Sequence, residues 1–179
     1  MMDRLAVQAA EAFAKAGYPE DAAAVLLIEL DGSETELARQ GAVVERLLEE
    51  SGAYRVDVAR DADAQARLWK GRKSAFPAVG RIAPDYYCMD GTIPRHRLAE
   101  VLTEIENLSQ EYGLQVANVF HAGDGNLHPL ILFDANRPGE LERTEEMGGR
   151  ILELCVAVGG TVTGEHGAVS YTHLTLPTN

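Results

Sequence analysis

Cysteine, positive charge and long apolar runs are all scarce in this sequence. Its 2 cysteines, Cys88 and Cys155, lack the spacing of a metal site, so both are expected to be buried, reduced thiols. Lysine and arginine total 16 against 28 aspartates and glutamates, which gives a formal net charge of -12. This charge argues against nucleic acid or an anionic membrane as the main partner. No run of about eighteen apolar residues occurs, so no transmembrane segment is expected.

A glycine-rich phosphate-binding loop is also missing, so nothing in the chain is expected to hold a dinucleotide. Residues 1–4 lead into an amphipathic helix rather than the apolar core of a signal peptide, which predicts a cytoplasmic protein. With 179 residues and 46% hydrophobic content, the chain is long enough for one sizeable core and short for two. One domain is therefore expected.

Helical and strand-like patterns alternate along the chain. Helical spacing predicts helices beginning near residues 3, 33, 61, 94 and 138, and strand-like runs lie at 25–30, 54–59, 86–89 and 161–163. A hairpin near the middle interrupts the alternation. These features favour an α+β domain, with a largely antiparallel sheet and helices packed on one face, over a doubly wound parallel sheet.

The segment 118–129, Asn-Val-Phe-His-Ala-Gly-Asp-Gly-Asn-Leu-His-Pro, has the residues of a metal site. Apolar runs flank Gly-Asp-Gly-Asn, a combination typical of a tight turn. A two-residue loop at Asp124 and Gly125 would place His121 directly opposite His128, with Cβ atoms roughly 4.5 to 5.5 Å apart. Two imidazoles held this close can chelate one divalent ion. The alternative is that the histidines are turn residues that bond to the backbone.

A third ligand is expected further along the chain, in the sequence Thr-Gly-Glu-His-Gly. Glu165 and His166 follow the strand-like run 161–163 and are flanked by glycines, which let the backbone approach a ligand closely. Two histidines and one carboxylate are a common set for catalytic zinc, manganese or iron, and they leave coordination positions open. We therefore expect His121, His128 and Glu165 to bind one divalent metal.

These same residues carry a family resemblance. His-Ala-Gly-Asp-Gly-Asn-Leu-His, followed by Gly-Glu-His-Gly, resembles the C-terminal domain of FAD-linked 2-hydroxy-acid oxidases. This family includes D-lactate dehydrogenases, D-2-hydroxyglutarate dehydrogenases and the catalytic subunits of glycolate oxidase, and the last group is the most similar. The likeness extends over Gly-Arg-Lys-Ser-Ala-Phe-Pro-Ala-Val-Gly-Arg at 71–81 and Pro-Asp-Tyr-Tyr-Cys-Met-Asp-Gly-Thr-Ile-Pro at 84–94. It covers nearly everything up to Gly167.

The resemblance implies a metal on the matching histidines and glutamate, and an FAD held mainly by a separate N-terminal domain. It also implies a small 2-hydroxy acid as substrate, of glycolate or D-lactate type, and other oxidase subunits as partners. Arg72 resembles the arginine that clamps the substrate carboxylate, a task that suits a planar, bidentate side chain. Asn126 is also assigned to substrate binding, and His166 is the candidate base. The alternatives are a solvated helix face for Arg72 and an orienting role beside Glu165 for His166.

Residues 169–179 do not fit the family pattern, which continues with a further glycine, a basic residue and a helical stretch. We expect residues 1–168 to form the substrate and metal domain, and 169–179 to be a non-native-looking tail on a fragment. Two other functions use the same ligands: a metal-binding subunit or interaction module without catalysis, and a metal-dependent hydrolase. The expected location is the cytoplasm, with attachment to the inner membrane through partner subunits as a further option.

Overall fold

The computed structural model describes residues 1–163. The elements follow the order β1 (Met2–Asp3), α1 (Arg4–Ala14), β2 (Ala24–Val25), α2 (Glu34–Glu50), α3 (Ala62–Val79), β3 (Asp85–Cys88), β4 (Gly91–Thr92), η1 (Arg95–Arg97), α4 (Leu98–Tyr112), β5 (Val116–Asn118), β6 (Asn126–Leu127), β7 (Pro129–Phe133) and α5 (Glu140–Ala157). Within this part of the chain, no helix is both long and apolar enough to cross a lipid bilayer.

The strands are antiparallel and are organised around β7. β3 and β5 flank β7 in a three-stranded sheet of order β3-β7-β5. β4 pairs with β6 in the same register, because the ladder that opposes Cys88 to Leu130 also opposes Gly91 to Leu127. β1, which pairs with β2, bridges to the residue just beyond β5. The predicted α+β class with antiparallel strands is confirmed.

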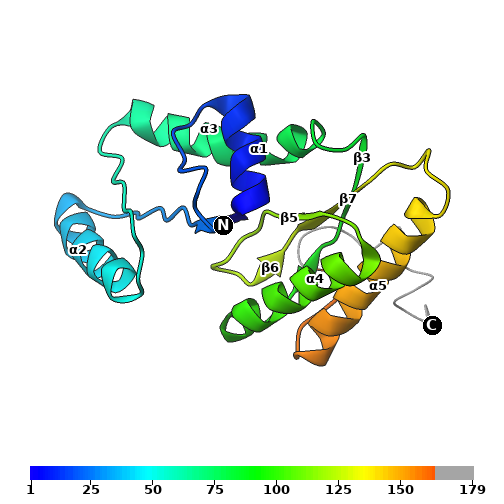
Figure 1. Cartoon of the computed structure of the whole chain (residues 1–179). Coiled ribbons are helices and arrows are strands. Elements are labelled where there is room, and N and C mark those ends of the chain that lie inside the picture. Colours follow the sequence, from blue (N-terminus) through cyan, green and yellow to red (C-terminus); the bar gives the residue numbers. More distant parts are fainter. Residues whose placement is uncertain (164–179) are drawn as a thin grey trace.

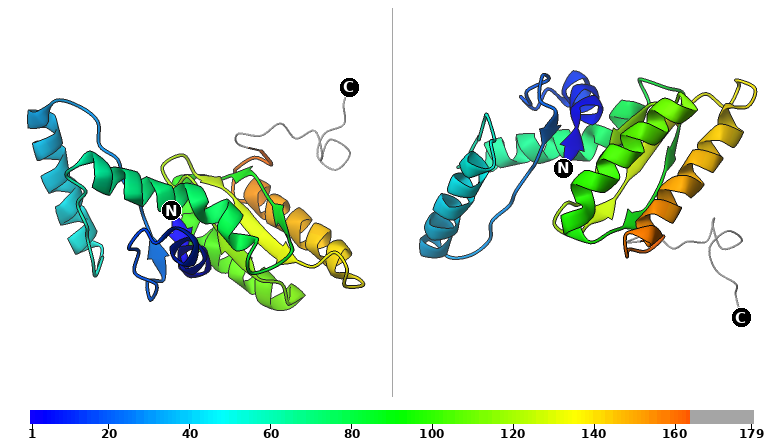
Figure 2. Two further views of the ribbon diagram at one scale, coloured as in Figure 1. Left: turned by 90° about the horizontal axis from the view of Figure 1, so that it is seen from above. Right: turned by 60° about the horizontal axis from the view of Figure 1, so that its bottom comes forward.

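Helices cover both faces of this sheet, although the sequence pattern predicted them on one face. α4 and α5 lie side by side (Figure 2) and share an apolar cluster with Ile131 of β7. α1 and α3 share a second cluster with Leu130, the preceding residue of the same strand. Successive side chains of a strand point to opposite faces, and both of these are 0% exposed. The continuous apolar run of β7 is the signature of a strand that is buried on both sides.

α2 lies apart from the rest of the molecule at the end of two extended segments (Figure 1). Its predicted capping box between Ser33 and Glu36 is present, but no residue of the helix is buried. The strand predicted at 25–30 is reduced to Ala24–Val25, and the one predicted at 54–59 is not formed. A strand needs a partner for its backbone hydrogen bonds, and neither segment has a neighbouring strand to pair with along most of its length.

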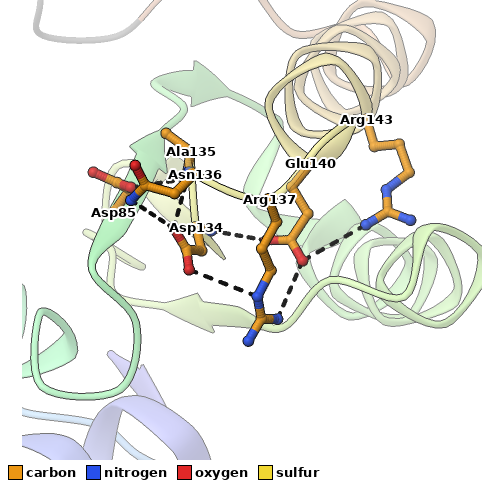
Figure 3. A network of polar contacts seen from close by, with 7 residues as sticks. All are labelled: Asp85, Asp134, Ala135, Asn136, Arg137, Glu140 and Arg143. Atoms are coloured by element: carbon orange, nitrogen blue, oxygen red, sulfur yellow. Dashed lines mark hydrogen bonds and ion pairs between the residues drawn. The ribbon is translucent and has the colours of Figure 1, made fainter.

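A network of polar contacts holds the turn between β7 and α5 (Figure 3). The Asp134 amide donates to the Glu140 carboxylate at 2.8 Å, and the Ala135 amide donates to Asp85 of β3 at 2.9 Å. The Arg137 guanidinium lies 3.6 Å from Asp134 and 3.3 Å from Glu140. This network joins α5 to the C-terminal end of β7. The histidine hairpin lies at the other end of the strand.

Candidate active site at the histidine hairpin

The hairpin carries His121 and His128, the two predicted metal ligands, but its turn is longer than predicted. His121 lies opposite Asn126, since the amide of His121 donates to the Asn126 carbonyl at 3.0 Å and the reverse bond is 3.3 Å. The loop therefore contains the four residues 122–125, and direct pairing of His121 with His128 is wrong. The physical reason is that the His121 carbonyl accepts the amides of three successive residues, 124–126, which winds the chain into a wider turn.

Gly125 explains why this wider turn forms. Its φ of +73° lies in the left-handed region, and a Cβ atom there would lie 2.1 Å from the carbonyl oxygen of Ile93. The Gly125 carbonyl also accepts the Ile93 amide at 2.9 Å. The turn is therefore packed against the chain that follows β4, and only glycine allows the approach.

The two histidine rings are nevertheless neighbours. The observed register differs from the predicted one by two residues, and a shift of two keeps every side chain on its face. The ring centroids of His121 and His128 are 5.6 Å apart, with an interplanar angle of 87°. His121 is exposed and His128 is 3% exposed. The hairpin thus supplies one solvent-facing and one buried imidazole on the same face.

A buried carboxylate, Asp90, lies opposite His128 and was not singled out from the sequence. Its Oδ1 atom is 3.7 Å from Nδ1 of His128, and the side chains are 11% and 4% exposed. Burial leaves few ways to satisfy such a group, and the hydroxyl of Thr163 donates to its Oδ2 atom at 3.1 Å. One signal in the sequence was available, because aspartate is depleted in strands and Asp90 directly follows the strand-like run 86–89.

The segment 161–163 lies beside β4, which brings the end of the described chain to the histidine face. Thr161 and Thr92 exchange backbone hydrogen bonds of 2.8 and 3.0 Å. Because β4 also pairs with β6, this segment lies one strand away from the hairpin. Glu165 and His166, the predicted third ligand and base, lie outside the described residues.

On this face, Asn126 and Thr92 have buried side-chain atoms with no hydrogen-bond partner within residues 1–163. Asn126, which is 3% exposed, lies opposite Thr92, and neither its amide oxygen and nitrogen nor the Thr92 hydroxyl is bonded. Buried polar groups are nearly always paired, because each unpaired one costs about 1–3 kcal/mol. Such groups beside two histidines have hydrogen-bonding capacity that a polar ligand can use. The assignment of Asn126 to substrate binding stays a prediction.

Helix α3 brings Arg72 and Phe76 towards the same end of the sheet. The Phe76 ring lies 6.2 Å from the His128 ring at 67°, and Arg72, one turn earlier, is half-buried. Burial and then the Arg72 charge lower the pKa of the Met1 amine to about 5. That amine donates to the carbonyl of Phe120 at 2.7 Å, next to the first histidine. Arg72 is therefore within electrostatic reach of the hairpin, although its role in binding substrate stays a prediction.

The described residues fit part of a metal site. His121 and His128 offer two nitrogen donors of the type that zinc, manganese and iron accept. No group of three or more histidine, cysteine, aspartate or glutamate side chains is arranged for a metal within residues 1–163. The metal site and Glu165 as its third ligand stay predictions, since Glu165 lies outside the described residues.

Residues 1–168 match the family model described as FAD linked oxidases, C-terminal domain, and the chain belongs to this family. The predicted family of FAD-linked oxidase C-terminal domains is confirmed.

Comparison with individual proteins gives more detail than the family match. The chain is 62% identical over 167 residues to the glycolate oxidase subunit GlcD of Escherichia coli (strain K12), and 35% identical over 166 residues to that of Bacillus subtilis (strain 168). It is 32% identical over 146 residues to a probable mitochondrial D-lactate dehydrogenase of Danio rerio. The alignments cover 93%, 93% and 79% of this chain but 34%, 35% and 29% of the relatives. The chain thus spans about a third of the length of these curated relatives.

Proposed function

We propose that this chain is the substrate- and metal-binding domain of a flavin-dependent enzyme that oxidises a small 2-hydroxy acid to the 2-oxo acid. The observation that carries the proposal is the polar face at the hairpin, where the buried, unbonded groups of Asn126 and Thr92 lie beside His121 and His128. The names of the relatives support the substrate class, because glycolate and D-lactate are both small 2-hydroxy acids.

We assign a divalent metal, zinc, manganese or iron, to His121, His128 and Glu165. The two neighbouring imidazoles support this assignment, and a carboxylate would complete a common catalytic set. When bound, such an ion polarises a substrate oxygen and lowers the pKa of a hydroxyl group. FAD, held mainly by the N-terminal part of the complete protein, would accept the hydride.

The side chains of this domain would bind the acid and remove its proton. Arg72 suits the substrate carboxylate, because its guanidinium donates two parallel hydrogen bonds. The Asn126 amide can both donate to and accept from substrate oxygens, which would satisfy its buried atoms. Oxidation removes a hydride from C2 and a proton from the hydroxyl, and we assign the proton to His166. The Phe76 ring beside His128 would exclude water from this end of the sheet.

The partners and location belong to the same proposal. A flavin-binding domain must supply the cofactor, and the word subunit in the names of the relatives fits further oxidase subunits. We place the protein in the cytoplasm, with contact to the inner membrane through such subunits.

The experiment uses the complete flavoenzyme that contains this domain, with kcat/KM for glycolate and D-lactate measured together with metal content. His121→Ala should lose metal and activity together, because two remaining ligands hold a divalent ion poorly. Arg72→Ala should keep its metal but lose roughly 2–5 kcal/mol in substrate capture, and Arg72→Lys should recover part of this loss.

The isolated chain is the matched control. Supplied with FAD, it should oxidise neither acid, because it offers no glycine-rich loop for the pyrophosphate. Turnover by the chain alone would contradict this expectation. Metal binding in the complete protein without oxidation of any 2-hydroxy acid would favour the non-catalytic module instead.

A further inference from the structure

We propose that Asp90 is the positioning residue of His128. Its carboxylate holds the Nδ1 side of the imidazole, so that the other ring nitrogen, Nε2, is left for what the site binds. The consequence for catalysis rests on the proposed function, but the positioning itself does not.

The backbone brings the two side chains together. The Met89 amide donates to the Pro129 carbonyl at 3.1 Å, and Gly91 lies opposite Leu127, so the ladder runs through the position between them. Asp90 and His128 are therefore directly opposed across two strands and share a face. Their approach depends on sheet register rather than on the chance conformation of two surface side chains.

The surroundings favour an ordered contact. Burial makes a charged carboxylate unfavourable unless it is paired, and the Asp90 and His128 side chains are only 11% and 4% exposed. Their separation of 3.7 Å lies within ion-pair range, and a movement of roughly 0.5–1 Å would give a hydrogen bond. The rings of Phe76 and His121, at 6.2 and 5.6 Å, lie against the same imidazole and restrict its rotation.

Thr163 extends this arrangement to a third segment. Its hydroxyl donates to Oδ2 of Asp90 at 3.1 Å, while Oδ1 is the atom nearest His128. One carboxylate thus uses both oxygens to connect the strand that carries His128 with the residue two positions before Glu165. A histidine that binds a metal usually donates its other N–H to a carboxylate or carbonyl, which sets the tautomer and the ring orientation.

The first test reads the tautomer of His128 in the metal-free, 179-residue chain. Nitrogen-15 NMR of labelled histidine distinguishes a protonated from an unprotonated ring nitrogen at a pH where the imidazoles are neutral. We expect the proton on Nδ1 in the wild type and a shift towards Nε2 in Asp90→Asn and Asp90→Ala. His96, an exposed histidine of η1, serves as the internal control and should not change.

Two results would overturn the proposal: a proton on Nε2 in the wild type, or a His128 spectrum that is the same in the wild type and both variants. Asp90→Asn keeps the shape of the side chain, so the test does not depend on whether Asp90→Ala folds. The tautomer of His128 in the wild type also tests the role of Asp90 without any variant.

The second test titrates the same chain with Zn²⁺ alone. Asp90→Asn should weaken zinc affinity by about 10- to 100-fold, the usual effect of losing the partner of a metal-binding histidine. The matched control is Asp3→Asn, since Asp3 is a half-buried aspartate that bonds instead to Asn118 and Ala6. Equal affinity in the wild type and Asp90→Asn would overturn the proposal. A wild-type chain that binds no zinc would overturn the metal assignment, and the tautomer would still decide the role of Asp90.

Discussion

The two faces of the central hairpin share one backbone but have opposite chemistry. On the face under α4 and α5, Phe120 and Leu127 are each 1% exposed and belong to an apolar cluster. Their immediate neighbours, His121, Asn126 and His128, lie on the other face. Because side chains alternate along a strand, a single register places the core and the candidate site at once. The site cannot slip by one residue without exposing the core.

The faces also differ in what they contribute to stability. Burial of apolar side chains under α4 and α5 stabilises the fold, at about 25 cal/mol per Å² removed from water. The unbonded polar groups of Asn126 and Thr92 on the other face oppose folding until a ligand satisfies them. Departures from good local packing are expected at functional sites. Four measurements test this difference between the faces.

The largest effect is expected from the apolar face. Ile131→Ala should lower the free energy of unfolding by about 2–5 kcal/mol, because the side chain is 0% exposed and its removal leaves a cavity. His121→Ala, on the exposed part of the other face, should change it by about 0.5 kcal/mol or less. Denaturant unfolding followed by circular dichroism compares the two. Equal losses would show that the faces do not differ as described.

The second effect is a loss of stability in alkali. Burial, and for Cys88 also the Asp90 charge, raises the pKa of the thiols of Cys88 and Cys155 to about 11, from an ordinary value of 9.0. Between these values the unfolded chain loses a proton that the folded chain keeps, so stability falls as pH rises. The slope is roughly 1.4 kcal/mol per pH unit for each thiol. Unfolding measured from pH 8 to 11 should show it, and Cys155→Ala should reduce the slope; a flat profile would contradict it.

The third effect has opposite signs for two threonines. Thr92→Val should raise the free energy of unfolding by about 1 kcal/mol, because its buried hydroxyl has no partner within residues 1–163. Thr163→Val should lower it by about 1 kcal/mol, because this hydroxyl donates to Asp90 at 3.1 Å. Thermal unfolding of both variants gives the signs. A loss of stability in Thr92→Val would mean that the polar face is satisfied without a ligand.

The smallest effect is expected far from both faces. Leu47→Gln in α2 should change stability by about 0.5 kcal/mol or less, since Leu47 is 48% exposed and no residue of α2 is buried. Ile105→Ala, in α4 and 0% exposed, is the comparison at a buried position and should lower the free energy of unfolding by about 2–5 kcal/mol. If Leu47→Gln destabilised the chain as much as Ile105→Ala, α2 would have to pack against the rest of the molecule.

Local patterns in the sequence predicted what depends on neighbouring residues. The capping box of Ser33 and Glu36 begins α2, the antiparallel α+β class is confirmed, and the hairpin lies where the turn residues indicated. The family could also be recognised from the sequence, because the residues of its motif at 121–128 are contiguous in the chain. The roles of Glu165 and His166 stay predictions, since both lie outside the described residues.

Contacts between distant segments decided the rest. The turn is four residues long because Gly125 meets the Ile93 carbonyl, a contact that no local pattern contains. Asp90 could not be assigned to His128 before the register of β3 and β4 against β6 and β7 was known. The apolar segment at 54–59 has strand periodicity but no strand beside it. Sequence periodicity determines which face a side chain can take, whereas register and partner depend on packing across the whole chain.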